Sequence, residues 1–262
     1  MKYIQKILKF EFNNVIRSRW VIFIFIFFFI VSYALFTFES NSQKSLVGLF
    51  NLVVYLVPLL GLIFGTVYFY NSKEYIEMML CQPIPRSALF IGLYFGTTLP
   101  LLLSLSGGIL LPYILFNPSH NHLELLLLLI FECIALAFIS ISISFLISTK
   151  LTDRVKGLSL SLFFYLIMAI AFDGLMLLFI FLFSDYPVEK FLLFLSLFNP
   201  VNLSRTLFVL NFDISALMGL TGALFKKFYG SFLGIFVTVI SLLFWILIPF
   251  WLGLRNFNKK DF

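Results

Sequence analysis

The chain has 262 residues, of which 61% are hydrophobic and 11% are charged, and its mean hydropathy is +1.07. This composition leaves too little polar surface to coat a soluble globule, so it excludes a soluble domain and indicates an integral membrane protein. The two cysteines, Cys81 and Cys133, predict neither a disulfide framework nor a thiolate metal site.

Residues 1–19 form a basic amphipathic segment. One helical face carries the apolar side chains Ile4, Ile7, Leu8, Phe12, Val15 and Ile16, with lysines mostly around the other. A helix of this kind lies among the headgroups of an anionic inner leaflet, so we expect contact with membrane lipids. The apolar run that follows exceeds the hydrophobic core of a signal peptide and lacks a small-residue cleavage site, which favours a retained first span.

Six continuous apolar runs are long enough to cross a bilayer core of about 30 Å. They cover Trp20–Phe38, Leu46–Tyr70, Ala88–Phe116, Leu123–Ser148, Leu158–Phe183 and Phe232–Leu254. Because the runs do not alternate between apolar and polar residues, helices are the expected spanning form. The sequence therefore predicts one all-α integral membrane domain over residues 1–262, with six transmembrane helices and an N-terminal interfacial helix. Four prolines are expected to kink the spans: Pro58, Pro100, Pro112 and Pro249.

Most of the 18 lysines and arginines face the cytoplasm if the N-terminus is placed inside. The positive-inside rule therefore predicts that both termini and the loop 71–88 are cytoplasmic. We expect a multi-pass protein of a bacterial inner (cytoplasmic) membrane.

The stretch Asn71–Arg86, NSKEYIEMMLCQPIPR, is a charged passage between two long apolar runs. Asn71 is a candidate N-cap with Glu74 as its reciprocal partner, and helical spacing of apolar residues predicts a short amphipathic helix on the membrane surface. Pro83 and Pro85 then end it. Lys73, Glu74 and Glu77 are expected on its exposed face. The stretch is either a docking loop for a motor subunit or an ordinary polar turn between spans.

The largest outer segment covers residues 185–230, between spans five and six. Asn199 followed by Pro200 predicts a helix start, and a second helix is expected after Asp213. Small side chains recur every four residues on that second helix, at Ser215, Gly219 and Ala223, which permits close helix approach in an apolar setting. We interpret the segment as short helices that dip into or lie on the outer surface, the alternative being a plain surface loop.

No Gly-Lys dipeptide occurs, so the chain lacks a phosphate-binding loop of the G-x-x-x-x-G-K-[ST] type, and no extramembrane segment is large enough for an ATPase domain. The metalloprotease motif H-E-x-x-H and the hydrolase motif G-x-S-x-G are also missing. We therefore expect a non-catalytic chain that binds no cofactor or metal. His120 and His122 flank Asn121, and two histidines without further ligands favour a solvated turn over a metal site.

Two carboxylates, Glu132 and Asp173, lie inside predicted spans four and five. An ionised carboxylate at mid-bilayer costs about 2.5 to 3.5 kcal/mol, so neither is expected to face lipid. Similar distances from the outer ends predict similar depth on antiparallel neighbouring helices. Since the spans contain no lysine or arginine, we expect at least one carboxylate to be protonated or bonded to a hydroxyl or amide. They line a polar transport cavity, or they hold the bundle together.

Three stretches resemble one family, the type-2 ABC exporter permeases. EFNNVIRSRW (Glu11–Trp20) resembles the family's connecting helix, and SKEYIEMMLCQPIPRSALFIGLYFG (Ser72–Gly96) is similar to its coupling segment. The second match departs from the family pattern at Tyr75, where many members carry glycine, and at Tyr94, where lysine is common. FNPVNLSRTLFVLNFDISALMGLTGALF (Phe198–Phe225) looks like the outer segment of one branch, the NosY-like permeases of transporters that mature nitrous oxide reductase.

The resemblance implies a homodimer of six-helix permeases, each docked through the loop 71–88 on a cytoplasmic ABC ATPase that holds ATP and Mg. It assigns coupling to Glu74, Glu77, Gln82, Pro83, Pro85 and Arg86. It assigns a surface for a periplasmic accessory protein to Asn199, Pro200, Arg205, Asp213, Gly219 and Gly222. No nucleic-acid partner is expected.

The branch implies a role in denitrification, namely assembly of the copper-sulfide centre of nitrous oxide reductase, either by transport or by mechanical action on the periplasmic partner. The alternative is a generic type-2 exporter permease for a lipid, drug or ion. An intramembrane enzyme that uses Glu132 and Asp173 as an acid/base pair is a remote alternative, since no nucleophile or metal set accompanies them.

Overall fold

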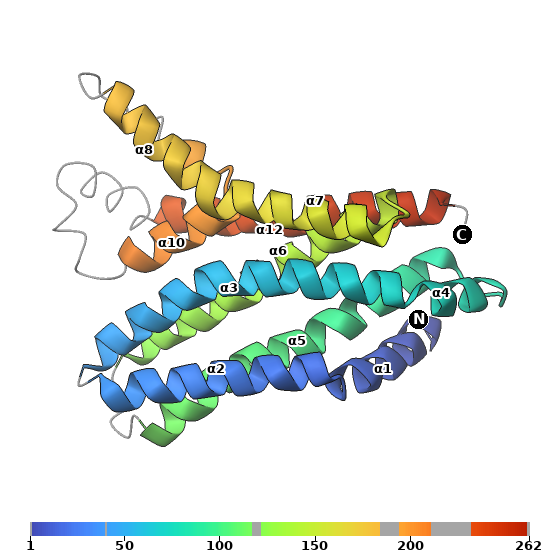
Figure 1. The fold of residues 1–262 in the computed structure, drawn as a ribbon, viewed down its shortest axis with the longest axis horizontal. Coiled ribbons are helices and arrows are strands. Elements are labelled where there is room, and N and C mark those ends of the chain that lie inside the picture. Colours follow the sequence, from blue (N-terminus) through green and yellow to red (C-terminus); the bar gives the residue numbers. More distant parts are fainter. Residues whose placement is uncertain (1, 40, 117–121, 184–193, 211–231, 261–262) are drawn as a thin grey trace.

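The computed structural model describes residues 2–39, 41–116, 122–183, 194–210 and 232–260, and every regular element in these ranges is helical (Figure 1). The elements are α1 (Lys2–Ile16), α2 (Arg19–Phe38), α3 (Ser42–Asn71), α4 (Lys73–Leu80), α5 (Arg86–Phe116), α6 (Leu123–Lys150), α7 (Arg154–Leu166), the π-helical turn η1 (Ile167–Ala171), α8 (Phe172–Leu182), α10 (Pro200–Leu210) and α12 (Phe232–Lys259). The predicted all-α membrane fold is confirmed.

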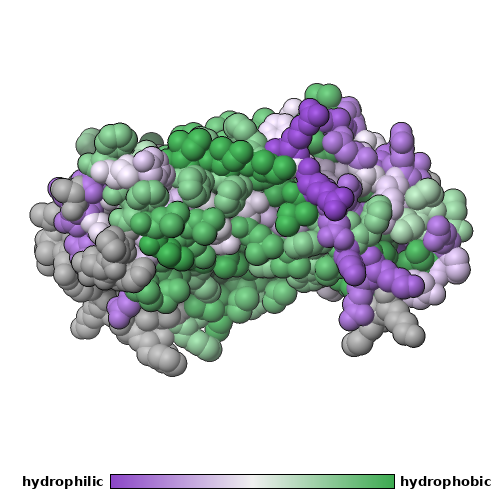
Figure 2. Space-filling model, turned by 90° about the horizontal axis from the view of Figure 1, so that it is seen from below, coloured by the Kyte–Doolittle hydropathy of each residue, from purple (hydrophilic) through white to green (hydrophobic). Residues whose placement is uncertain are grey.

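Six helical segments are long and apolar enough to span a membrane, at positions close to those predicted from the sequence: Arg19–Phe38, Ser42–Asn71, Arg86–Phe116, Leu123–Lys150, Arg154–Phe179 and Phe236–Lys259. Hydrophobic side chains cover the middle of the molecule, and hydrophilic ones gather toward its ends (Figure 2). The helices α3, α5 and α12 contain the four prolines that the sequence places in spans. This distribution matches a bundle with its long axis across the bilayer.

The helices α3 and α6 pack closely at the centre of the bundle because small residues line their contact. A Cβ atom at Gly61 would lie 2.7 Å from the Cβ of Ser140, and one at Gly65 would lie 2.0 Å from the Oγ of Ser144. Both distances are too short for real contacts. Such seams of small residues drive helix association where no hydrophobic force distinguishes a helix from lipid.

Helix α1 lies along the first half of α5 at the same end of the bundle as α4 and the C-terminus (Figure 1). Its buried stripe is Ile7, Glu11 and Val15, at a spacing of four residues. Gly92 and Gly96 on α5 make the contact close, because a Cβ at Gly96 would lie 2.4 Å from the Cβ of Glu11. The common location of the termini and α4 agrees with the predicted topology, while the side of the membrane stays a prediction.

The fifth span is divided and little buried. It consists of α7, η1 and α8, and α8 diverges from the rest of the bundle (Figure 1). Only 6% of its apolar window is buried, against 22 to 67% for the other five spans. Its first helix, α7, is joined to α3 by a hydrogen bond of 2.9 Å between the hydroxyls of Ser161 and Thr66.

The glycine contact between α1 and α5 predicts that Gly96→Ala destabilises the protein. The added methyl would clash with the Cβ of Glu11, which no side-chain rotation can move away. Overpacking of this kind lowers the free energy of unfolding by about 1 to 3 kcal/mol. The matched control is Gly174→Ala in α8, where nothing lies within 4 Å of the added methyl. Thermal unfolding in detergent is expected to show a lower Tm for Gly96→Ala alone. Equal Tm values would contradict the close packing.

Candidate coupling surface and intramembrane polar cluster

The short charged loop does contain a helix, α4, but its start differs from the prediction. Helix α3 continues through Asn71, and Ser72 is the residue before α4, with no side-chain capping bond. The predicted cap of Asn71 with Glu74 is therefore wrong, because Asn71 is the last residue of α3 and does not precede α4 as a cap. The end is as predicted: α4 stops at Leu80, ahead of Pro83, and α5 begins at Arg86.

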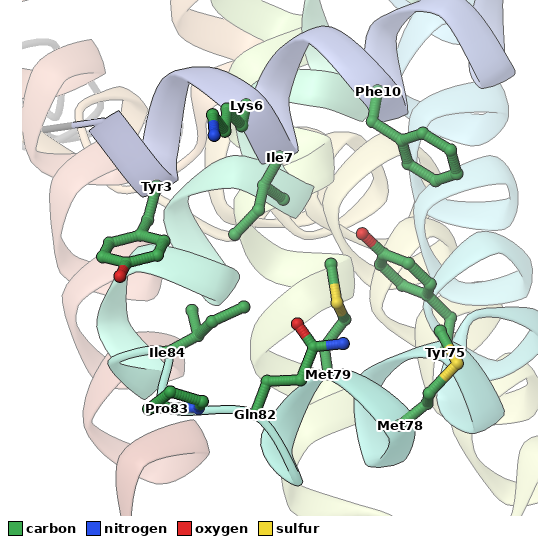
Figure 3. A pocket seen from close by; sticks show the side chains of 10 residues that line it. All are labelled: Tyr3, Lys6, Ile7, Phe10, Tyr75, Met78, Met79, Gln82, Pro83 and Ile84. Atoms are coloured by element: carbon green, nitrogen blue, oxygen red, sulfur yellow. The ribbon is translucent and has the colours of Figure 1, made fainter.

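A groove of about 590 Å³ separates α1 from α4 and the corner that follows it (Figure 3). Ten side chains line the groove, and most are apolar: Tyr3, Lys6, Ile7, Phe10, Tyr75, Met78, Met79, Gln82, Pro83 and Ile84. Phe10 of α1 and Tyr75 of α4 stack at one end, with ring centroids 5.6 Å apart. Met78 is 56% exposed, so the groove presents apolar surface outside the membrane-spanning helices.

The predicted coupling residues occupy four different environments. Gln82 and Pro83 line the groove, whereas Pro85 and Glu74 are exposed outside its lining. Glu77 is half-exposed and forms an ion pair of 3.6 Å with Lys73 one turn earlier on α4.

Arg86 lies at the first position of α5 and binds the end of the last helix. One of its terminal nitrogens, Nη1, donates to the backbone carbonyls of Asn258 at 3.1 Å and Lys260 at 2.8 Å. The C-terminal carbonyls of a helix carry partial negative charge and lack partners within the helix, so a guanidinium stabilises them. Arg86 therefore joins the loop after α4 to the end of span six.

Glu11 is a site residue that the sequence reasoning did not single out. Its side chain is 1% exposed, and the hydroxyl of Tyr68 on α3 donates a hydrogen bond to its Oε2. Burial raises the pKa of Glu11 above 4.5, and the Tyr68 bond partly opposes that rise. The signal was present, because Glu11 stands midway between the apolar residues Ile7 and Val15 on one helical stripe.

The raised pKa of Glu11 predicts a pH-dependent stability. The folded protein holds this proton more tightly than the unfolded chain, so the contribution is complete below pH 4.5 and is lost as the pH rises through the folded pKa. Glu11→Gln is expected to remove that dependence. Tm measured from pH 4.5 upwards tests this, with the exposed Glu39→Gln as control. A wild-type profile in Glu11→Gln would contradict the assignment.

The two intramembrane carboxylates both lie against α10. Glu132 is fully buried, and neither of its oxygens has a hydrogen-bond partner in the described part of the chain, although the hydroxyl of Ser204 faces it. Asp173 accepts a bond of 2.6 Å from Nη2 of Arg205. The sequence analysis considered only cations within the spans, whereas the cation that pairs with Asp173 lies on α10.

The expected side-by-side placement of the two carboxylates is also corrected. Asp173 is on α8, which diverges from the bundle, and α10 connects the two sites through the adjacent residues Ser204 and Arg205 (Figure 1). Arg205 also donates to the hydroxyl of Tyr55 on α3. The cluster thus joins α3, α6, α8 and α10 through polar groups.

The first helix of the outer segment starts where the sequence predicts. The Asn199 side chain accepts from the backbone N–H of Val201 at 3.0 Å, and α10 begins at Pro200. The amide of Asn199 also donates to the carbonyl of Met168 in η1 at 2.6 Å. Both Asn199 and Pro200 are buried, so α10 starts inside the bundle rather than on its surface. Asp213, Gly219 and Gly222 lie outside the described residues.

The ion pair predicts strong coupling between Asp173 and Arg205. Arg205→Met leaves the carboxylate without its cation and is expected to cost about 1 to 3 kcal/mol. The double variant Asp173→Asn/Arg205→Met leaves no charge unpaired. Its loss of unfolding free energy should therefore be smaller than the sum of the losses in the two single variants. A double-mutant cycle of unfolding in detergent measures this. Additive losses would contradict the pairing.

The predicted turn with two histidines falls partly outside the described residues, which include His122 but not His120. The ring of His122 lies 3.3 Å from the side-chain amide of Gln43. Among the described residues, no group of three or more His, Cys, Asp or Glu side chains is placed to hold a metal ion.

A family model described as "ABC-2 family transporter protein" matches residues 5–262. The chain belongs to the ABC-2 transporter family. No curated protein matches the sequence. The family supports a type-2 ABC permease, a membrane subunit that is generally not itself catalytic and that works with an ABC ATPase, commonly as a dimer. The six spans and the ABC-2 match together establish a multi-pass membrane protein.

Proposed function

We propose that this chain is the permease of an ABC transporter whose ATPase subunit docks at the groove between α1 and α4. The observation that carries the proposal is the exposed apolar lining of this groove at the end of the bundle that holds both termini (Figure 3). An amphipathic helix of the ATPase fits such a groove through its apolar face. Glu74, Glu77, Gln82, Pro83, Pro85 and Arg86 surround the docking position and convey its movement.

The transport cycle follows from this placement. Closure of the ATPase dimer moves α4, and α4 is joined directly to α3 and, through the proline corner, to α5. Arg86 extends the connection to the end of α12. The free energy of ATP binding then shifts the population between two arrangements of the spans. ATP and Mg act on the partner subunit.

A second copy of the chain covers the face of the fifth span. This span is the least buried of the six. Its Asp173 and the partner Arg205 on α10 each keep about 30% of the side chain exposed. An ion pair at that depth is poorly placed against lipid, so a polar cleft between two copies suits it better than hydrocarbon does.

The biological role that we propose is maturation of the copper-sulfide centre of nitrous oxide reductase in the bacterial inner membrane, with a periplasmic accessory protein at the outer end. Its support is the resemblance of Phe198–Phe225 to that branch. Asn199, Pro200 and Arg205 would then order α10 near the partner surface, to which the resemblance also assigns Asp213, Gly219 and Gly222. The second candidate is a generic exporter permease for a lipid, drug or ion, which the family match alone supports.

The docking proposal predicts that Met78→Glu weakens ATPase binding. A carboxylate in the apolar groove must lose water on docking, and a central interface change of this kind lowers affinity by about tenfold or more. Mild-detergent purification from native membranes with mass spectrometry measures the ATPase that copurifies. Asn14→Glu is the control, since Asn14 is exposed on α1 but does not line the groove.

Retention of the ATPase by Met78→Glu at the level of Asn14→Glu would contradict docking at this groove. Recovery of a periplasmic protein in the same preparation supports the maturation role, and its absence favours the generic exporter. Arg86→Glu is a less specific test, because it also breaks the bonds to the C-terminal end of α12.

A further inference from the structure

The carboxylate of Glu11 occupies a position that ordinary packing does not explain. Helix α1 is mostly exposed, yet this charged side chain lies in its most buried stripe, with Gly96 of α5 against its Cβ. An apolar residue would continue the stripe of Ile7 and Val15 without the cost of removing a carboxylate from water. The position therefore suggests a use for the acidic group.

The first partner of this carboxylate lies at the end of the second span. Tyr68 stands one turn before Ser72, at which α3 gives way to α4, and its hydroxyl donates to Oε2 of Glu11. A hydrogen bond to a charged acceptor is stronger than one between neutral groups. This bond holds α1 to the part of α3 that adjoins α4.

A second hydroxyl is available nearby. Tyr75 lies on α4, and its hydroxyl is buried without a hydrogen-bond partner among the described residues. Burial, followed by the charge of Glu11, raises the pKa of Tyr75 to about 12, so this hydroxyl keeps its proton and remains a donor. Stacking of its ring on Phe10, the residue before Glu11, keeps it beside α1.

We propose that Glu11 is a positioning residue for coupling: its carboxylate binds the Tyr68 hydroxyl in the present arrangement and gains the Tyr75 hydroxyl as a second donor when α4 moves toward α1. The carboxylate then ties α1, α3, α4 and α5 into one unit. Movement of the docked ATPase reaches the spans through this unit. The inference rests on the proposed function, because it requires a motor at α4.

The proposed pairing of Glu11 with Tyr75 depends on a residue at which this chain departs from the resembled family. Tyr75 stands where many permeases of the resembled family carry glycine, which has no hydroxyl to donate. The pairing of Glu11 with Tyr75 thus adds a connection between α1 and α4 that a glycine at this position cannot provide.

The test uses the complex of the permease with its ATPase in lipid nanodiscs, and compares wild type with Tyr75→Phe, Tyr68→Phe, Glu11→Gln and Glu11→Leu. Two quantities are measured: the amount of ATPase bound, and the change in backbone hydrogen exchange of α10 between the nucleotide-free and the vanadate-trapped states. Tyr33→Phe and Glu39→Gln are the matched controls, because Tyr33 on α2 and Glu39 directly after α2 are exposed and do not line the groove.

We expect the exchange response of α10, normalised to the amount of ATPase bound, to fall about fivefold to tenfold in Tyr75→Phe, the effect of losing one buried hydrogen bond on a two-state equilibrium. Glu11→Leu should lose the response as well. Adding Tyr75→Phe to Glu11→Leu should then have no further effect. Glu11→Gln, which keeps an acceptor oxygen, should recover part of it.

A wild-type exchange response in both Tyr75→Phe and Glu11→Leu would overturn the inference, as would a response lost in Glu11→Leu but unchanged in Tyr75→Phe, since that pattern describes a structural anchor. If wild type itself fails to hold the ATPase, the proposed function fails before this question arises. If wild type responds to nucleotide, the proposed function stands, and the variants decide the role of Glu11 alone.

Discussion

The structure depends on hydrogen bonds between polar groups that the chain takes into an apolar environment. Lipid offers no hydrogen-bond partner, so an intramembrane polar side chain is stabilised where another part of the protein supplies one. Asn199 illustrates the rule, since its oxygen caps α10 while its amide binds Met168 in the π-helical turn. Arg205 and Asp173 meet the same requirement with a charge pair. These bonds place α10 inside the bundle.

The same requirement separates the two ends of the molecule in their chemistry. At the end that holds α4 and both termini, the buried acid Glu11 lies outside the spans and has a tyrosine donor. Away from that end, Glu132 lies within α6, and neither of its oxygens has a hydrogen-bond partner among the described residues. Between the two ends, small residues at Gly61 and Gly65 let α3 approach α6 closely.

The spans were predictable because a long apolar run has one stable form in a bilayer, and the bounds of all six agree closely with the sequence reading. Local chemistry also located the start of α10 at Asn199 and Pro200. The predicted cap at Asn71 was wrong because the capping preference of a residue does not show where the preceding helix ends. The partner of Asp173 was missed for a different reason: it is 32 residues away, and only the folded chain brings Arg205 to the same depth.

That separation has a consequence for how the protein is made. When the fifth span first enters the membrane, Arg205 has yet to follow, so Asp173 must wait in the bilayer at a cost of about 2.5 to 3.5 kcal/mol. Until α10 packs against it, the transmembrane placement of this span is only marginally stable. Insertion of the fifth span and re-entry of α10 are therefore one coupled step of biogenesis, in which the later segment secures the earlier one.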